Sequence, residues 1–587
     1  MPEQCLLDLR LPRSLDVIEA WAVREGASRL EAWVFEDRAT RAAAELRLAQ
    51  LGIEARLRSA YKPLLHAVLE DFGLEAVGQD GGTPEGQVLR VQLPQALAQR
   101  YRMEAYPLAG LLAEGALQFE LSEPQAADTV LLQRGEQAPL TVFMPLRADH
   151  SATAWLRAWA GEALLRDGPL VGDDYQGVFD AVLAAVAAHD WGWNEPYFQR
   201  LMIEVEIGGI EAALPFGDEV ISTREALHED FYFGLLEFFQ QRAGRGAGDR
   251  SLRPGQIVPI VLPAAAEVRE TRVRMRLLEH PLLAESQAES QADGFDLAAL
   301  ATCAAPLSPA LVAACMGSLA GERFGCLSTQ GRAVSGLHRR GMRPAVVITA
   351  GQHANECSGV LGALRAVAEL QHRADATYAL VALENPDGAA LHQQLCLQQP
   401  RHMHHAARFT ALGDDLEWRT APGQLGEKAA RLEALQRSGA RLHLSLHGYP
   451  AHEWTRPLSG YLPPGYASWA IPRGFFLIMR HHAGLDPWPY LQALTAGLAL
   501  DERLLEFNAR QYRLWEAHWG EMPMRIINGI GCMVAVDSRT DSAPFTLITE
   551  YPDETVYGEA FQLAHDTQTR MVLLACDLYW QGLLDPV

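Results

Sequence analysis

Residues 344–356 read PAVVITAGQHANE, an apolar run that gives way abruptly to polar residues. An uninterrupted apolar run rich in β-branched residues is typical of a strand buried on both faces of a sheet. The next segment, SGVLGALRAVAEL (358–370), has apolar residues at helical spacing, and TYALVAL (377–383) is a second buried-strand pattern. Strand, helix and strand joined by short connections predict parallel strands covered by helices.

Two further apolar runs extend this pattern toward the C-terminus. LHLSL (442–446) and FTLIT (545–549) each predict a buried strand, and they are followed directly by His447 and Glu550. The first run is likewise followed by His353 and Glu356. Because functional groups of parallel sheets collect at the carboxyl ends of the strands, we expect these four side chains to converge.

The residue types in this set match a catalytic metal site. His353 and Glu356 are three residues apart, so both can reach one ion from a turn that enters a helix. His447 would add a third ligand and leave one position for water, as catalytic zinc requires, and Glu550 could accept the proton of that water. The alternative is an H-x-x-E pair on a solvated helix face, which is unsurprising in a chain with 19 histidines. The position of each group after a buried strand favours the metal site.

Composition narrows the class of protein. The chain has 587 residues, with 50 Lys and Arg against 73 Asp and Glu, a formal net charge of −23. Such acidity opposes binding to nucleic acid or anionic membranes, and we expect neither partner. No apolar run is long enough to span a membrane, the N-terminus lacks a signal-peptide pattern, and the eight cysteines form no C-x-x-C pair. We therefore expect a cytoplasmic protein; its oligomeric state stays open.

The length and the patterns along the chain predict a multidomain α/β protein. Residues 1–138 alternate strand and helix patterns and predict a small α/β domain of unknown role. Residues 139–250 contain long apolar segments rich in Ala, Leu and Trp, which predict an all-α domain. We assign 251–319 to a connector and 320–587 to the catalytic domain.

A second, weaker constellation lies in the middle segment. His150 precedes one expected helix, and His189 with Asp190 ends another. This arrangement resembles the HD superfamily of metal-dependent phosphohydrolases and would form a second metal site. That family needs a further aspartate, for which Asp230 is the candidate. The alternative, a helical bundle in which these residues are structural, is the interpretation we favour.

The C-terminal half, about 320–587, resembles the zinc carboxypeptidase family with its succinylglutamate desuccinylase and aspartoacylase relatives. The resemblance is carried by STQGR (328–332), GQHANE (351–356) and NPDG (385–388). It implies an α/β/α domain with a mixed, mostly parallel sheet and a Zn²⁺ ion held by His353, Glu356 and His447. It also implies Glu550 as general base and Arg401 as the cation that stabilises the oxyanion; a surface position is the alternative for Arg401.

Two features depart from that family. Where its carboxypeptidases carry an Asn-Arg pair that binds the substrate carboxylate, this chain has Glu417 and Trp418, with Arg419 one place later as a substitute. Glu554 is a rival to Glu550 as the base. A carboxylate in a carboxylate-binding site would repel such substrates.

The predicted function is a zinc-dependent hydrolase that cleaves an amide bond of a peptide or an N-acyl amino acid. Three alternatives stay open: a deacylase or amidase on a small N-acyl amino acid, an HD-type phosphohydrolase, and a zinc-binding module without turnover.

Overall fold

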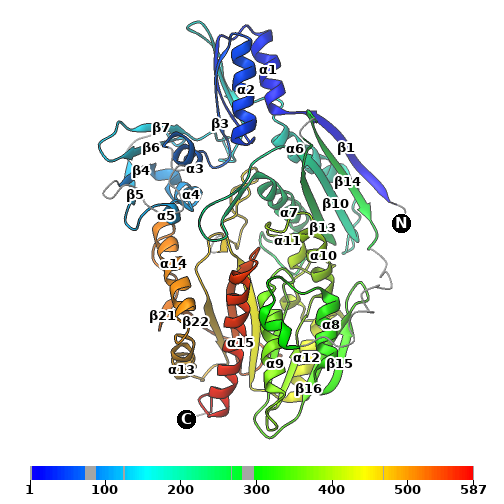
Figure 1. Ribbon diagram of the computed structural model, residues 1–587. Helices are drawn as coiled ribbons and strands as arrows, with labels where there is room; N and C mark the ends of the chain where they lie inside the picture. Colours follow the sequence, from blue (N-terminus) through cyan, green and yellow to red (C-terminus); the bar gives the residue numbers. More distant parts are fainter. Residues whose placement is uncertain are drawn as a thin grey trace.

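The computed structural model describes residues 3–72, 88–122, 126–265, 268–280, 297–466 and 469–585. These residues form five sheets, and Figure 1 shows the largest of them in the lower part of the molecule, with three smaller ones above it. The largest sheet lies entirely within the C-terminal half, where the sequence predicts the catalytic domain.

The large sheet has nine strands in the order β15-β16-β18-β17-β19-β23-β20-β22-β21. In chain order they are β15 (Glu322–Leu327), β16 (Ala333–Arg339), β17 (Val346–Ala350), β18 (Tyr378–Val381), β19 (Leu442–Pro450), β20 (Phe476–His481), β21 (Arg525–Ile527), β22 (Ile530–Val536) and β23 (Phe545–Glu554). The four predicted buried strands are confirmed as β17, β18, β19 and β23, and they lie side by side and parallel at the centre.

Helices cover both faces of this sheet. The helices of this half are α8 (Pro309–Ser318), α9 (Ser358–Leu370), α10 (Pro386–Cys396), α11 (His405–Arg408), α12 (Lys428–Ser438), α13 (Trp488–Leu498), α14 (Glu502–His518) and α15 (Glu559–Trp580), of which α10 and α11 pack against the N-terminal half. Val346 and Ile348 of β17 pack into one core with α9, α13 and α15, whereas Val347 packs into the other with Ala430 and Ala434 of α12. Because strand side chains alternate in direction, the continuous apolar run supplies both cores.

The N-terminal half holds three four-stranded sheets and a short two-stranded one. The first contains β1 (Gln4–Pro12), β10 (Arg200–Ile207), β13 (Gln256–Pro263) and β14 (Glu270–Leu278), with α6 (Asp174–Ala188) and α7 (Thr223–Arg242). The second contains β2 (Arg29–Val34), β3 (Glu54–Ser59), β8 (Trp155–Ala160) and β9 (Ala163–Pro169), with α1 (Ser14–Arg24) and α2 (Arg38–Gln50). The third contains β4 (Leu89–Pro94), β5 (Leu117–Ser122), β6 (Thr129–Arg134) and β7 (Leu140–Phe143), with α3 (Pro63–His66), α4 (Ala98–Glu104) and α5 (Leu108–Leu111); β11 (Glu211–Ala213) pairs with β12 (Val220–Ser222).

The prediction of an all-α domain at 139–250 is wrong, because this segment contains strands β7 to β12 beside α6 and α7. The segment after His150, where a helix is expected, forms β8 and β9 instead. These strands turn at Gly161 and pair with each other, and β8 also pairs with β2. Leu156 and Ala158 are buried on one face of β8, so the same sequence also fits the two-residue repeat of a strand. Pairing with β2 overrides the helix propensity of Leu and Ala.

The sheets also join segments that the sequence assigns to different domains. Strand β1 of the 1–138 segment pairs with β14, and β2 pairs with β8, which follows residue 138. The 251–319 segment, predicted to be a connector, supplies β13 and β14 to the first N-terminal sheet. The N-terminal half is therefore built from strands that are distant in sequence.

A buried ion pair fastens the two halves together. Lys62, which follows β3, contacts Glu453, which follows β19, and their side chains are 3% and 1% exposed. Burial opposes the charged form of Lys62, but the carboxylate of Glu453 raises the pKa of the ammonium group overall. Beside this pair, His452 lies 2.9 Å from Glu225 of α7. The loop after β19 is thus held by charged side chains of the N-terminal half.

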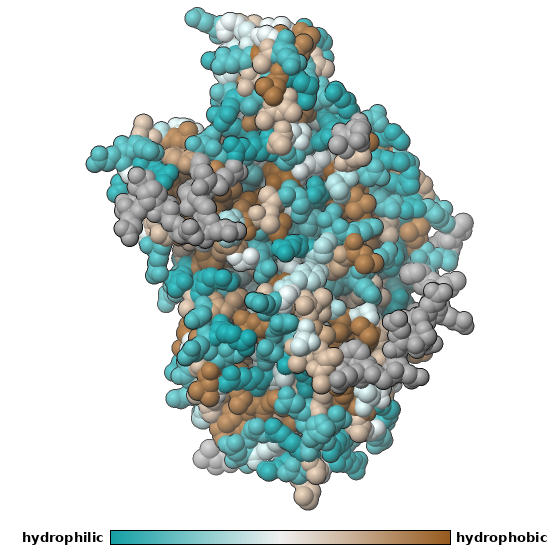
Figure 2. Space-filling model, in the orientation of Figure 1, coloured by the Kyte–Doolittle hydropathy of each residue, from teal (hydrophilic) through white to brown (hydrophobic). Residues whose placement is uncertain are grey.

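Polar residues cover most of the face that Figure 2 shows, with apolar residues in scattered patches. Among the described residues, no helix combines the length and apolarity needed to cross a membrane.

Replacing Lys62 by alanine should lower the free energy of unfolding by about 3–5 kcal/mol, because Glu453 is left as an unpaired buried charge. Chemical denaturation measures this loss. The matched control is Arg10→Ala, whose pair with Glu270 is 61% and 52% exposed and should be worth about 0–1 kcal/mol. Equal, small losses in both variants would contradict the importance of the buried pair.

Candidate metal centre

His353, Glu356 and His447 come together at the carboxyl ends of two adjacent strands. His353 and Glu356 lie in the loop between β17 and α9, and His447 lies in β19. His353 Nδ1 is 2.8 Å from Glu356 Oε1, and His447 Nδ1 is 2.9 Å from Glu356 Oε2. Among the described residues, this is the one group of three or more His, Cys, Asp or Glu side chains with ligand atoms within 4.8 Å of one another.

The loop that carries two of these side chains depends on Gly351. Its φ of +63° turns the chain sharply at the end of β17, and a Cβ there would lie 2.7 Å from Leu383 Cδ1. Glycine is the residue that tolerates both conditions. His353 and Glu356 therefore face β19 rather than continuing along β17.

The two motifs that flank the H-x-x-E sequence contact each other. Ser328 Oγ and Gln330 N donate hydrogen bonds to Asp387 at 2.7 and 2.9 Å, and Arg332 pairs with the same carboxylate at 2.8 Å. Asn385 caps α10 by accepting a hydrogen bond from Gly388 N at 2.9 Å. STQGR and NPDG thus brace the segments beside the His-Glu loop.

Glu356 is the charged centre of the cluster. Its carboxylate also accepts hydrogen bonds from Arg408 Nη1 at 2.6 Å and Gly448 N at 3.1 Å. Burial would raise the pKa of Glu356, but the neighbouring His353, Arg408 and His447 hold it well below its ordinary value. Two imidazoles and an ionised carboxylate are the donor set of a three-ligand catalytic zinc site.

Asp415 orients His353, and the sequence analysis did not predict this role. Its Oδ2 lies 3.3 Å from His353 Nε2, while its Oδ1 accepts hydrogen bonds from Gln352 Nε2 at 2.9 Å and Glu417 N at 3.0 Å. A carboxylate on the outer nitrogen leaves Nδ1 directed at the ligand cluster, which is how metal-binding histidines are commonly held. No spacing rule links Asp415 to His353, which it meets only in the folded chain.

A cavity of about 550 Å³ opens beside the cluster. His353, His447 and Glu550 all line it, and Glu550 of β23 is the register partner of His447. Burial, and next the charge of Glu356, raises the pKa of Glu550 well above its ordinary value. A carboxyl group with a raised pKa is suited to proton transfer near neutral pH. Arg250, from the loop after α7, also lines the cavity.

Three residues that the sequence analysis considered for the site do not line the cavity: Arg401, Arg419 and Glu554. Arg401 is exposed and does not line the cavity, whereas Arg408, seven residues later, lines it and contacts Glu356. Arg419 does not line it either, because its guanidinium is held by Asp414 at 2.7 Å and by Glu427. Glu554 is buried 3.7 Å from Arg408, outside the residues that line the cavity.

The residues of the predicted second metal site do not join such a cluster. His150 is exposed in the loop between β7 and β8, and His189 ends α6 with its ring against Trp191. Asp190 is exposed and accepts a hydrogen bond from Gly192 N at 3.1 Å. Asp230 accepts hydrogen bonds from Leu458 N at 3.0 Å and from Ser459.

Comparisons with known proteins give distant likenesses only. No family model matches the chain, and no curated protein matches it. Among solved structures, one from Shewanella denitrificans described as a metallopeptidase is 15% identical, with 47% of this chain and 88% of that chain covered and a TM-score of 0.29. A metallo-carboxypeptidase from Pseudomonas aeruginosa is 17% identical (54% and 73% covered, TM-score 0.30), and carboxypeptidase A from Helicoverpa armigera is 10% identical (60% and 95% covered, TM-score 0.32). Because these scores are low, the activity is inferred below from this chain's own residues.

Elemental analysis tests the cluster directly. The wild type should hold about one zinc ion per chain, and His353→Ala should hold almost none, because two of the three ligands cannot retain the ion at micromolar protein. His189→Ala is the matched control and should keep the wild-type content. Zinc that persists in His353→Ala and disappears in His189→Ala would move the metal site to the N-terminal half.

Removing the outer carboxylate should weaken the site without abolishing it. We expect Asp415→Ala to lower zinc affinity by about 10–100-fold, because His353 loses the partner that orients its ring. Competition with a chromogenic chelator measures the affinity. Asp541→Ala, a change of a cavity-lining carboxylate whose side chain is 40% exposed, should leave it unchanged; equal effects in both variants would contradict the role of Asp415.

Proposed function

We propose that this protein is a zinc-dependent hydrolase of the carboxypeptidase type that cleaves an amide bond of a peptide or an N-acyl amino acid. One observation carries the proposal: the two histidines of a His-Glu-His cluster and the carboxyl group of Glu550 line the same cavity at the ends of parallel strands. That arrangement pairs a site for a Lewis-acidic ion with a group able to move protons.

The residues divide the chemistry between them. His353, Glu356 and His447 would hold the ion, which supplies a water of lowered pKa and polarises the scissile carbonyl. Glu550, as carboxylate, accepts the proton of the attacking water and returns it to the leaving amine. Arg408 lies 2.6 Å from Glu356 and lines the cavity, so its guanidinium can balance the negative charge that develops on the carbonyl oxygen.

A deacylase acting on a small N-acyl amino acid is the second candidate. Two observations favour it: the cavity, at about 550 Å³, is of a size for a small molecule, and Arg419 is already matched by Asp414 and Glu427. A peptidase that binds a terminal carboxylate would have to do so through the cations that line the cavity, which do not include Arg419. Assays with peptides and N-acyl amino acids, each with a free or an amidated carboxylate, separate the two.

Glu550→Gln should lower amide turnover by about 10²–10⁴-fold at unchanged zinc content, because the variant cannot accept a proton. Steady-state kinetics of the zinc-loaded protein on the best amide of the panel measures the loss. Glu554→Gln is the comparison variant and should keep turnover within about tenfold, since Glu554 does not line the cavity.

The reverse order of these two variants would assign the base to Glu554. Wild-type protein that holds zinc but hydrolyses no amide would favour a binding module. Hydrolysis of phosphate esters that survives His353→Ala would favour a phosphohydrolase instead.

A further inference from the structure

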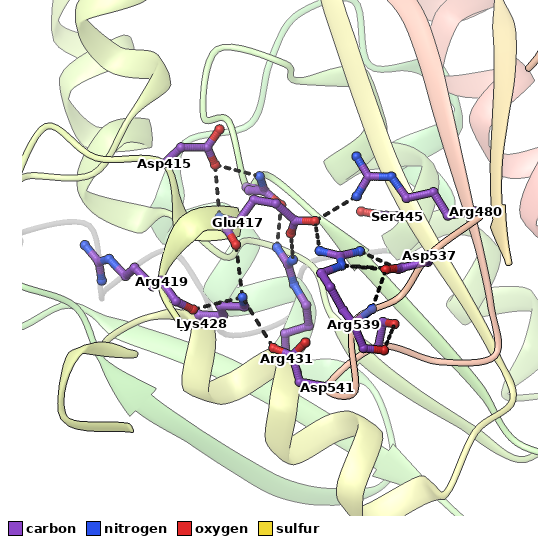
Figure 3. A network of polar contacts seen from close by, with 12 residues as sticks. Asp415, Glu417, Arg419, Lys428, Arg431, Ser445, Arg480, Asp537, Arg539 and Asp541 are labelled. Atoms are coloured by element: carbon purple, nitrogen blue, oxygen red, sulfur yellow. Dashed lines mark hydrogen bonds and ion pairs between the residues drawn. The ribbon is translucent and has the colours of Figure 1, made fainter. Parts of the chain in front are cut away.

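Three arginines from three parts of the large domain converge on one carboxylate. Arg431 of α12 and Arg480 of β20 each lie 2.8 Å from the carboxylate of Glu417, and Arg539, which follows β22, contacts it as well. Figure 3 shows these side chains pointing toward Glu417 from different sides. All four residues line the cavity that holds the metal cluster.

The charge balance of this group differs from that of an ordinary structural ion pair. Arg431 is also matched by Glu384 at 2.6 Å, and Arg539 by Asp537 at 2.8 Å. Arg480, in contrast, has Glu417 as its one acidic partner within the part of the chain that the structure describes. A single carboxylate therefore serves three guanidinium groups, and one of them depends on it entirely.

The group around Glu417 is more accessible than the neighbouring group around Arg419. The side chain of Glu417 is 22% exposed and that of Arg480 is 36% exposed, whereas Arg419 and its partners Asp414 and Glu427 are 4% exposed or less. The first group therefore faces the cavity, whereas the second is enclosed. Guanidinium groups bind carboxylates in paired hydrogen bonds, and the same geometry accepts a carboxylate from a ligand.

Glu417 also lies on the turn that supports the metal cluster. Leu416–Trp418 form a short 3₁₀ turn, and Glu417 N donates to Asp415 Oδ1 at 3.0 Å. Lys428 Nζ donates to the carbonyl oxygen of Glu417 at 3.1 Å, which holds the backbone of the turn. Both contacts are made by backbone atoms of Glu417, so they do not depend on the position of its side chain.

We propose that Arg431, Arg480 and Arg539 form a carboxylate subsite of the cavity that Glu417 occupies as an internal competitor. A free carboxylate of the substrate replaces Glu417 on Arg480 and Arg539, so the substrate class is an amide that carries an acidic group away from the scissile bond. The identification of this ligand as a substrate rests on the proposed function. The anion subsite itself is tested by binding measurements alone.

Calorimetric titration of the zinc-loaded protein with succinate tests it, with neutral succinamide as the control ligand. Glu417→Gln should bind succinate about tenfold more tightly than the wild type, because the competing carboxylate is gone. Arg480→Gln should bind it about tenfold more weakly, because a charge-assisted contact is lost. The matched control is Arg437→Gln, since Arg437 lies on α12 with Arg431 but pairs with Glu433 and Glu322 and does not line the cavity.

Succinate affinity that is unchanged or weaker in a folded Glu417→Gln protein would overturn the proposal. Should that variant fail to fold, equal affinities in Arg480→Gln and Arg437→Gln would overturn it, and a loss confined to Arg480→Gln would support it. Succinate bound by zinc alone would persist in Arg480→Gln, which also counts against the subsite. Failure of the proposed function is seen separately, as absent zinc or absent amide hydrolysis.

Discussion

The carboxylate of Glu356 is the contact on which the site depends. It joins two imidazoles, the guanidinium of Arg408 and the backbone N–H of Gly448, and so it links the loop after β17 to β19 and α11. Each partner opposes the cost of burying a negative charge, and together they keep the group ionised. Loss of this charge would leave His353 with Asp415 and Arg408 with Glu554 as their remaining acidic neighbours, at 3.3 and 3.7 Å.

The sequence predicts the parts of this arrangement that depend on local patterns, and it misses contacts between residues that are distant in the chain. The apolar runs at 344–350 and 442–446 predict buried strands because burial on both faces is a local property of the letters. Their adjacency then places His353 and His447 together, as the sequence analysis expected. Arg408 and Asp415 escaped it, because their partners lie 52 and 62 residues away and no periodicity records such a contact.

The failures in the N-terminal half have the same physical origin. The sequence of β8, WLRAWA (155–160), fits a helical repeat as well as the two-residue repeat of a strand. Pairing with β2, more than a hundred residues earlier, stabilises the strand. The pairing of β1 with β14 spans a still longer stretch of chain. Non-local strand pairing of this kind is the part of a fold that local patterns do not encode.

Cationic side chains gather around the cavity although the chain as a whole is acidic. The chain carries a net charge of −23, yet the cavity is lined by more cations than anions. The cations are Arg250, Arg408, Lys428, Arg431, Arg480 and Arg539, and the anions beyond the metal cluster are Asp415, Glu417, Asp541 and Glu550. Arg408, Arg431 and Arg539 are also matched by Glu356, Glu384 and Asp537. Arg480 has only Glu417 as an acidic partner among the described residues, so of the three arginines around Glu417 it is the least neutralised.

The N-terminal half takes part in this site through direct contacts. Arg250 enters the cavity from the loop after α7 and lies over the ring of Tyr466, and His405 of the cavity wall is 2.7 Å from Glu229 of α7. Glu229 is fully buried, so it approaches His405 from behind rather than from the solvent. Since Lys62 also anchors the loop after β19, the walls around the metal cluster are shared between the two halves. The large sheet alone would present the metal ligands in an incomplete cavity. The N-terminal sheets therefore help to shape the space in which a substrate binds.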